Sequence, residues 1–217
     1  MHRTRIKICG LTRREDVKAA LNFGVDALGL VFYAPSPRYV NALHAKQLVK
    51  NLPAFVSRVG LFVNEPAESV RSVLETVPLN LLQFHGDEDA VYCEQFGLPW
   101  IKAARVRPGV DLLECAASFK DAVGFSGLLL DAYVDGFGGA GTSFDWSLIP
   151  RAMDVPIILS GGLHPGNVAA GIDAVRPWAV DVSSGVEIEG GPKGIKDARK
   201  IEQFIAGVRN ADAGSSV

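Results

Sequence analysis

Short apolar runs alternate with longer segments of helical spacing along almost the whole 217-residue chain. Several runs are apolar at nearly every position, as in Ala27-Leu28-Gly29-Leu30-Val31-Phe32, which is typical of parallel strands buried on both faces. The pattern predicts eight strands, at Ile6–Cys9, Ala27–Phe32, Arg58–Val63, Leu79–Phe84, Trp100–Ala103, Gly127–Asp131, Pro156–Ser160 and Ala179–Ser183.

Segments with helical spacing follow the predicted strands. The first three carry apolar or small residues at Val17, Ala20, Leu21 and Gly24, then at Leu43, Leu48 and Leu52, then at Val70, Val73, Leu74 and Val77. One strand follows another after roughly 20–30 residues, the size of a βα unit. We therefore predict an α/β fold, a (β/α)8 TIM barrel formed by one domain over residues 1–209, with a polar tail at 210–217. The alternative, a doubly wound open sheet, would usually need fewer strands or additional edge elements.

Composition and charge narrow the class of protein. The chain is 48% hydrophobic and 21% charged, as soluble globular proteins are. A net charge of −2 gives no general attraction to nucleic acid or to anionic membranes. No apolar run approaches the ~18 residues of a membrane span, and the N-terminus lacks the apolar core of a signal peptide. Three cysteines without zinc-ligand spacing favour a reducing compartment, so we expect a soluble cytoplasmic protein.

In a TIM barrel the active site lies where the strands end, and Cys9 ends the first strand. Cys9 shares a face with Lys7, and it points into the barrel mouth if the isoleucines beside it face the helices. The segment Thr12-Arg13-Arg14-Glu15 fits a capping box that opens a helix. A nearby helix start and Lys7 predict a lowered pKa for the Cys9 thiol. The alternative interpretation is that Cys9 is a small buried apolar side chain.

Two further charges belong to this region. Lys7 should point into the barrel, where an unpaired ammonium is costly, and we predict Asp181 as its partner. Asp131 directly follows Leu128-Leu129-Leu130, and dry surroundings favour the protonated form that a general acid needs. Asp131 is otherwise an ordinary cap or turn residue. The glycine-rich segment at 136–142 either folds over a ligand or merely turns.

Arg38 and His85 are candidates of a second kind, for binding. Arg38 follows the second strand in a proline-stiffened loop and can present its planar fork to a carboxylate, or it is an exposed surface arginine. His85 shares a face with Gln83 and can carry a proton or form a hydrogen-bonding wall, or it is a structural histidine.

Glycines and small hydroxyl residues follow the last two predicted strands. They are Gly161-Gly162 and Ser183-Ser184-Gly185. Barrels commonly bind phosphate through backbone N–H groups at these two positions, so the sequence predicts a phosphate site there.

Several of these segments together resemble the phosphoribosylanthranilate isomerase family. The resemblance rests on Lys-Ile-Cys-Gly-Leu-Thr at 7–12, Ser-Pro-Arg-Tyr at 36–39, Gln-Phe-His-Gly at 83–86, Leu-Leu-Asp at 129–131, Phe-Asp-Trp at 144–146, Ser-Gly-Gly-Leu at 160–163 and Val-Asp-Val-Ser-Ser-Gly-Val-Glu at 180–187. These segments occur in order over nearly the whole chain, and as a set they are highly specific.

The resemblance implies a step of tryptophan synthesis, the Amadori rearrangement of N-(5′-phosphoribosyl)anthranilate to 1-(2-carboxyphenylamino)-1-deoxyribulose 5-phosphate. It makes Cys9 the general base, Asp131 the general acid and Arg38 the arginine that binds the substrate carboxylate. The family's phosphate-binding turns fall on the segments 161–162 and 183–185, and the aspartate of its last strand falls on Asp181. We expect Asp181 and His85 to bind the substrate. The chemistry needs no metal or organic cofactor. At Thr142 some relatives carry Lys, which leaves the ligand contacts of that loop open.

Three other functions remain open from the sequence. Cys9, His85 and Asp131 could form a thiol hydrolase, although they lie on well-separated strands and nothing else marks an acyl site. The chain could instead be a phosphosugar-binding module with a structural Cys9, although such a module needs neither an acid–base pair nor Arg38. A related aminosugar of histidine synthesis is a further candidate substrate. The sequence does not reveal the oligomeric state.

Overall fold

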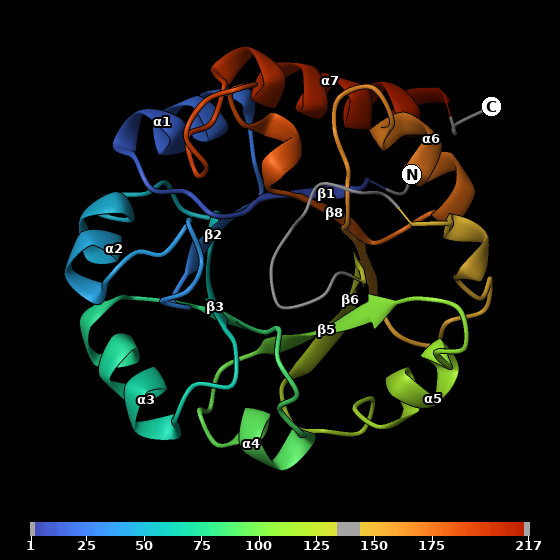
Figure 1. The fold of residues 1–217 in the computed structure, drawn as a ribbon, viewed down its shortest axis with the longest axis horizontal. Helices are drawn as coiled ribbons and strands as arrows, with labels where there is room; N and C mark the ends of the chain where they lie inside the picture. The colour runs from blue at the N-terminus through green and yellow to red at the C-terminus, as the bar shows by residue number, and fades with distance from the viewer. Residues whose placement is uncertain (1–2, 134–143, 215–217) are drawn as a thin grey trace.

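The computed structural model describes residues 3–133 and 144–214. Eight parallel strands form a closed barrel in which each strand pairs with its neighbours in sequence and the last pairs with the first (Figure 1). The strands are β1 (Arg5–Ile8), β2 (Ala27–Val31), β3 (Ser57–Phe62), β4 (Leu81–Phe84), β5 (Trp100–Val106), β6 (Phe125–Ala132), β7 (Ile157–Leu159) and β8 (Ala179–Val182). The predicted TIM barrel is confirmed.

Helices form a ring around the barrel (Figure 1). They are α1 (Arg14–Phe23), α2 (Ala42–Leu48), α3 (Ala67–Thr76), α4 (Ala90–Glu94), α5 (Leu112–Ala117), α6 (Val168–Val175) and α7 (Ala198–Gly214). Between β6 and β7 the part of the chain that the structure describes holds only a 3-10 turn, η1 (Trp146–Leu148). A second 3-10 turn, η2 (Ser184–Val186), follows β8.

Alternation along the strands divides the core into an outer and an inner layer. Ile6 and Ile8 point outward into the large cluster between the barrel and the helices. A smaller cluster fills the barrel itself and consists of Ile101, Ala103, Leu129, Ile158 and Ala179. Because Ile6 and Ile8 face the helices, Lys7 and Cys9 face inward, as the sequence predicts.

The capping box predicted at the start of the first helix is not formed. The N-cap of α1 is Arg13 and no side chain caps the helix, while the Thr12 hydroxyl donates to the carbonyl of Gly194 at 2.9 Å. The Thr12 hydroxyl, which a capping box would use to cap the helix, is therefore bonded to the distant Gly194 instead. On α2 the buried residues are Ala45 and Leu48, and Leu43 is 73% exposed. An isolated leucine on a short helix is a weak indicator of burial.

The last helix extends further than the predicted domain boundary. α7 continues to Gly214, and Ala211, inside the predicted tail, is buried. The Asp212 carboxylate accepts hydrogen bonds from the backbone N–H and the hydroxyl of Thr4, at 2.9 and 2.6 Å. This contact holds the end of α7 beside the start of β1. Among the described residues, no helix is both long and apolar enough to cross a membrane.

Candidate active site

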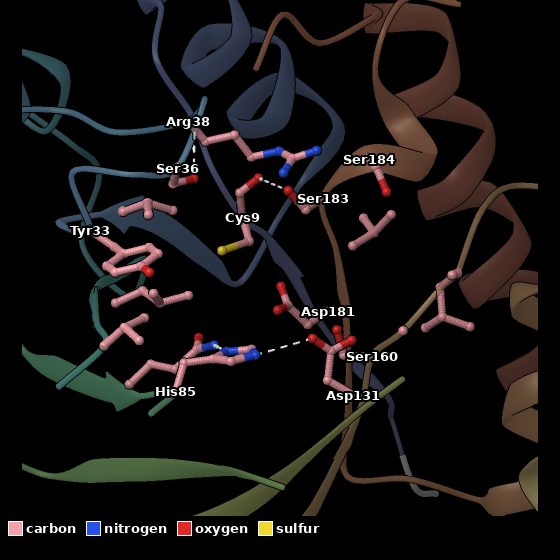
Figure 2. A pocket seen from close by; sticks show the side chains of 18 residues that line it. Cys9, Tyr33, Ser36, Arg38, His85, Asp131, Ser160, Asp181, Ser183 and Ser184 are labelled. Carbon is pink, nitrogen blue, oxygen red and sulfur yellow. Dashed lines mark hydrogen bonds and ion pairs between the residues drawn. The ribbon is translucent and has the colours of Figure 1, made fainter. Parts of the chain in front are cut away.

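A single cavity at the carboxyl ends of the strands gathers most of the predicted site. It contains about 700 Å³ of empty space, including the part open to solvent. Nine of the ten predicted residues line it: Cys9, Arg38, His85, Asp131, Gly161, Gly162, Asp181, Ser183 and Ser184 (Figure 2). Strands far apart in sequence therefore deliver these side chains to one place, as the barrel topology requires.

Cys9 lies at the end of β1 with its thiol directed into the cavity (Figure 2). Its N–H donates to the Val182 carbonyl at 2.8 Å, and its carbonyl accepts from the Ser183 hydroxyl at 3.1 Å. Burial raises the pKa of the Cys9 thiol, and the positive charge of Lys7 only partly offsets this effect. The predicted lowering of the Cys9 pKa is therefore wrong, because desolvation of the thiolate outweighs the neighbouring ammonium.

Lys7 and Asp181 form a buried ion pair inside the barrel, as predicted. The Lys7 ammonium donates to Asp181 Oδ2 at 3.0 Å, and both side chains are almost completely buried. Burial by itself lowers the pKa of Lys7, but the attraction of Asp181 and a hydrogen bond with Cys9 outweigh it and raise the pKa. Lys7 is therefore a fixed positive charge below Cys9. The second carboxylate oxygen of Asp181, Oδ1, is buried and has no hydrogen-bond partner in the described structure.

Asp131 is linked to β4 through His85. Asp131 Oδ2 lies 3.1 Å from His85 Nε2, and Oδ1 accepts the N–H of Ala132 at 3.0 Å. The other ring nitrogen, Nδ1, lies 3.0 Å from the side-chain amide nitrogen of Gln83. Figure 2 shows His85 directed at Asp131 across the floor of the cavity. Both carboxylate oxygens are thus held in place.

Arg38 is a buried side chain and its fork is already paired. Its Nε and Nη2 donate to the two carboxylate oxygens of Glu187 at 2.7 and 3.2 Å. Nη1 makes no hydrogen bond with any described residue, so this donor can face a ligand. The alternative of a surface arginine is wrong, because Arg38 is only 6% exposed.

Lys196 completes this charge cluster and is not among the residues predicted from the sequence. Its ammonium donates to the Ser183 carbonyl at 2.9 Å and to Glu187 at 3.2 Å. Burial raises the pKa of Glu187, but the hydrogen bond from Arg38 and the charge of Lys196 outweigh it and lower the pKa. Lys196 follows β8 in an irregular segment without periodicity, so no pattern marks it as a site residue.

The two predicted phosphate turns pack directly against each other. Gly161 has φ +75°, a conformation that favours glycine, and a Cβ there would lie 2.4 Å from the Ala132 nitrogen. A Cβ on Gly185 would lie 1.9 Å from the Leu163 carbonyl oxygen. The turn after β8 can therefore pack this closely against the turn after β7 only because residue 185 is glycine. Gly185 has this packing role and does not line the cavity. The predicted glycine-rich loop at 136–142 lies outside the described residues.

The geometry favours acid–base chemistry over the other candidates. His85 pairs with Asp131, and no hydrogen bond joins His85 to Cys9 within the described part of the chain, so the arrangement of a thiol hydrolase is not formed. Residues 3–133 and 144–214 contain no group of three or more His, Cys, Asp and Glu side chains that could hold a metal ion.

Comparisons with known proteins identify the family. The sequence model for N-(5′-phosphoribosyl)anthranilate (PRA) isomerase matches residues 6–207. The chain is 60% identical to the N-(5′-phosphoribosyl)anthranilate isomerase of Dechloromonas aromatica over 210 residues, which is 97% of this chain and 98% of that protein. It is 54% identical to that of Methylibium petroleiphilum over 211 residues, 97% and 96% of the two chains.

The chain belongs to the phosphoribosylanthranilate isomerase family. Among solved structures, the isomerase from Thermotoga maritima superposes with a TM-score of 0.84 at 41% identity, covering 95% of this chain and 99% of that one. A phosphoribosylanthranilate isomerase in complex with reduced 1-(o-carboxyphenylamino)-1-deoxyribulose 5-phosphate gives a TM-score of 0.81 at 40% identity, with the same coverage. The resemblance in the sequence is confirmed, and with it an isomerase activity on phosphoribosylanthranilate in tryptophan biosynthesis.

Proposed function

We propose that Cys9 is the general base and Asp131 the general acid of this isomerisation. One observation carries the proposal: the two side chains reach the same cavity from β1 and β6, with the phosphate turns of β7 and β8 on its wall (Figure 2). A substrate anchored there by its phosphate presents its sugar ring to both groups. An acid and a base on different strands can act on different atoms of one ring.

The two groups act in sequence. Asp131 gives its proton to the ring oxygen, the bond from that oxygen to C1′ breaks, and the nitrogen lone pair forms a Schiff base at C1′. Cys9, as thiolate, then takes the proton from C2′, and the electron pair moves to give an enolamine. The enolamine tautomerises to the ketone. One proton leaves Asp131 and one arrives at Cys9, so the site exchanges a proton with solvent or product between turnovers.

Each part of the substrate has a matching group on the cavity wall. The phosphate takes backbone N–H groups at Gly161-Gly162 and at Ser183-Ser184, where glycine allows close approach. The anthranilate carboxylate takes the Nη1 donor of Arg38, whose other edge is held by Glu187. The unpartnered Oδ1 of Asp181 accepts a sugar hydroxyl. The ligand is therefore a small phosphorylated molecule.

The cysteines support a reducing compartment for this enzyme. Cys9, Cys93 and Cys115 are all free thiols. Burial raises the pKa of Cys93 to about 12, and burial also raises the pKa of Cys115. Protonated thiols of this kind resist oxidation, and the one cysteine in the cavity must stay reduced to act as a base. We place the protein in the cytoplasm.

A fluorescence assay tests the activity. Freshly prepared phosphoribosylanthranilate is added to the folded protein and the loss of its fluorescence is followed. The signal should decay in proportion to enzyme concentration, and pre-incubation with the reduced product analogue that the solved relative binds should slow the decay. An unchanged signal with folded protein would overturn the assignment.

A further inference from the structure

Gln83 is a buried polar side chain that the steps above do not use. It points into the barrel from β4, is fully buried, and lies two residues before His85. Its amide nitrogen is 3.0 Å from His85 Nδ1, and His85 Nε2 is 3.1 Å from Asp131 Oδ2. Three side chains thus form one line of hydrogen bonds from the barrel interior to the acid.

The chemistry of the amide fixes the protons along this line. An amide nitrogen can only donate, so Nδ1 must accept and carry no hydrogen. The ring hydrogen of neutral His85 then lies on Nε2 and is donated to Asp131 Oδ2. A side chain that accepted from Nδ1 would produce the opposite arrangement, with a lone pair of Nε2 facing the carboxylate.

We propose that Gln83 is a positioning residue that holds His85 in the Nε2–H tautomer and thereby sets the orientation of the Asp131 carboxyl group. Asp131 Oδ2 then accepts from His85 while Oδ1 accepts from the Ala132 N–H at 3.0 Å. With both oxygens restrained, the plane of the carboxyl group is fixed. The catalytic value of this arrangement depends on the acid role of Asp131 proposed above.

An amide suits this position better than any other side chain of its size. The Gln83 carbonyl oxygen is buried and has no hydrogen-bond partner in the described structure. The amide nitrogen, held 3.0 Å from Nδ1, supplies the donor that this ring nitrogen needs in the Nε2–H tautomer. Methionine offers Nδ1 no donor, and an ionised glutamate offers only acceptors, which favour a hydrogen on Nδ1.

The charged surroundings of His85 come from several elements. The titratable and charged groups that share its cavity are Cys9, Tyr33, Arg38, Asp131 and Asp181. On the β5 side, Lys102 is paired with Glu88 at 2.8 Å and Arg105 with Asp87 at 2.9 Å. Of all these groups, Asp131 is the one whose side chain is joined to the His85 ring by a hydrogen bond in the described structure. Exchange of Gln83 alone should therefore move the tautomer of His85.

Nitrogen-15 NMR of the histidine rings tests the proposal on the whole protein without substrate. The chain has four histidines, and the signal missing from His85→Asn identifies His85. Above neutral pH the wild type should show Nε2 protonated and Nδ1 unprotonated. In Gln83→Met the two nitrogens should move toward averaged shifts, as in a free imidazole. In Gln83→Glu the ring should keep its second proton to higher pH than in the wild type.

Kinetics with the same variants separate positioning from packing. Gln83→Met should lower kcat about tenfold with little change in KM, as expected when an outer partner of a catalytic group is lost. Gln47→Met, on the exposed face of α2, is the matched control and should leave both constants unchanged. Gln83→Glu keeps the size of the side chain and decides the question if Gln83→Met does not fold.

Two results would overturn the proposal. One is wild-type His85 with its hydrogen on Nδ1. The other is a His85 tautomer and titration midpoint that stay the same in both Gln83 variants. A normal tautomer shift in a protein without isomerase activity would instead reject the proposed function and leave the Gln83 assignment intact, so the two failures are distinguishable.

Discussion

At Cys9, burial and charge act on the thiol in opposite directions. Burial raises its pKa, the ammonium of Lys7 lowers it, and the carboxylate of Asp181 raises it again. The net effect is upward, so the resting protein holds Cys9 mainly as the neutral thiol near pH 7. A base must be deprotonated to act, and the fraction of Cys9 that is present as thiolate should grow as the pH rises.

The pH profile should show this directly. We expect the rate at which iodoacetamide alkylates Cys9 to rise with pH from neutrality toward the raised thiol pKa, because only the thiolate reacts. The measurement is the logarithm of this rate against pH in buffers of constant ionic strength, with Cys9→Ala as the blank for the other two thiols. A rate that is already independent of pH below pH 7 would show that the thiol has a lowered pKa and would contradict this prediction.

Single residues show what the sequence could and could not predict. Strand alternation correctly placed Lys7 inside the barrel and led to Asp181 as its partner, because direction along a strand is a local property. The pKa of Cys9 was predicted with the wrong sign, because burial depends on the finished fold. The partner of Arg38 is Glu187, 149 residues away, and no local pattern connects them.

Between elements, a buried ion pair joins β5 to the loop before α4. The Lys102 ammonium donates to Glu88 at 2.8 Å and to the Gly86 carbonyl at 2.7 Å, and both charged side chains are almost fully buried. Glu88 also accepts from the backbone N–H groups of Asn64 and Gly86, at 2.7 and 2.9 Å. The pair therefore fixes the turn that directly follows His85.

Breaking this pair on one side should be costly. Lys102→Met leaves the Glu88 carboxylate buried without its counter-charge, and we expect a loss of about 3 kcal/mol in the free energy of unfolding. Adding Glu88→Gln removes the stranded charge but keeps an acceptor for the backbone, so the double variant should be clearly more stable than Lys102→Met. Urea unfolding followed by circular dichroism measures both. Equal stability of the single and double variants would contradict this explanation.

At the level of elements, strands were easier to predict than the segments between them. Each of the eight apolar runs overlaps an observed strand, because burial on both faces leaves a continuous apolar signal. The capping box at 12–15 failed because the Thr12 hydroxyl bonds to Gly194, a contact made only after the chain closes. The 3-10 turn η1, in the described part of the connection between β6 and β7, had no distinct sequence signal.

Across the whole molecule, closure of the barrel depends on the two ends of the chain. β1 pairs with β8, and α7 packs against α1 and α6 beside that seam (Figure 1). Four apolar residues of α7 are almost completely buried, namely Ile201, Phe204, Ile205 and Val208. The last helix therefore covers the seam at which the sheet closes, and the contact of Asp212 with Thr4 holds it there.

Truncation of α7 side chains should weaken the entire fold. Phe204 is fully buried, and Phe204→Ala should lower the free energy of unfolding by about 3–5 kcal/mol through lost apolar contact and the cavity that remains. Leu43→Ala is the matched control, since Leu43 is 73% exposed on α2 and should change stability by no more than about 0.5 kcal/mol. The comparison is made by urea titration. Similar midpoints for the two variants would show that α7 does not support the barrel.

The central claim is that Cys9 and Asp131 perform the chemistry while other groups hold the substrate. The most direct test measures two quantities on Cys9→Ala and Asp131→Asn. They are the single-turnover rate of phosphoribosylanthranilate isomerisation and the affinity for the reduced product analogue. Each variant should react at least about a hundredfold more slowly than the wild type, because acid–base catalysis typically contributes 10²–10⁴-fold. Affinity for the analogue should stay close to that of the wild type. A near-normal rate in either folded variant would contradict the claim.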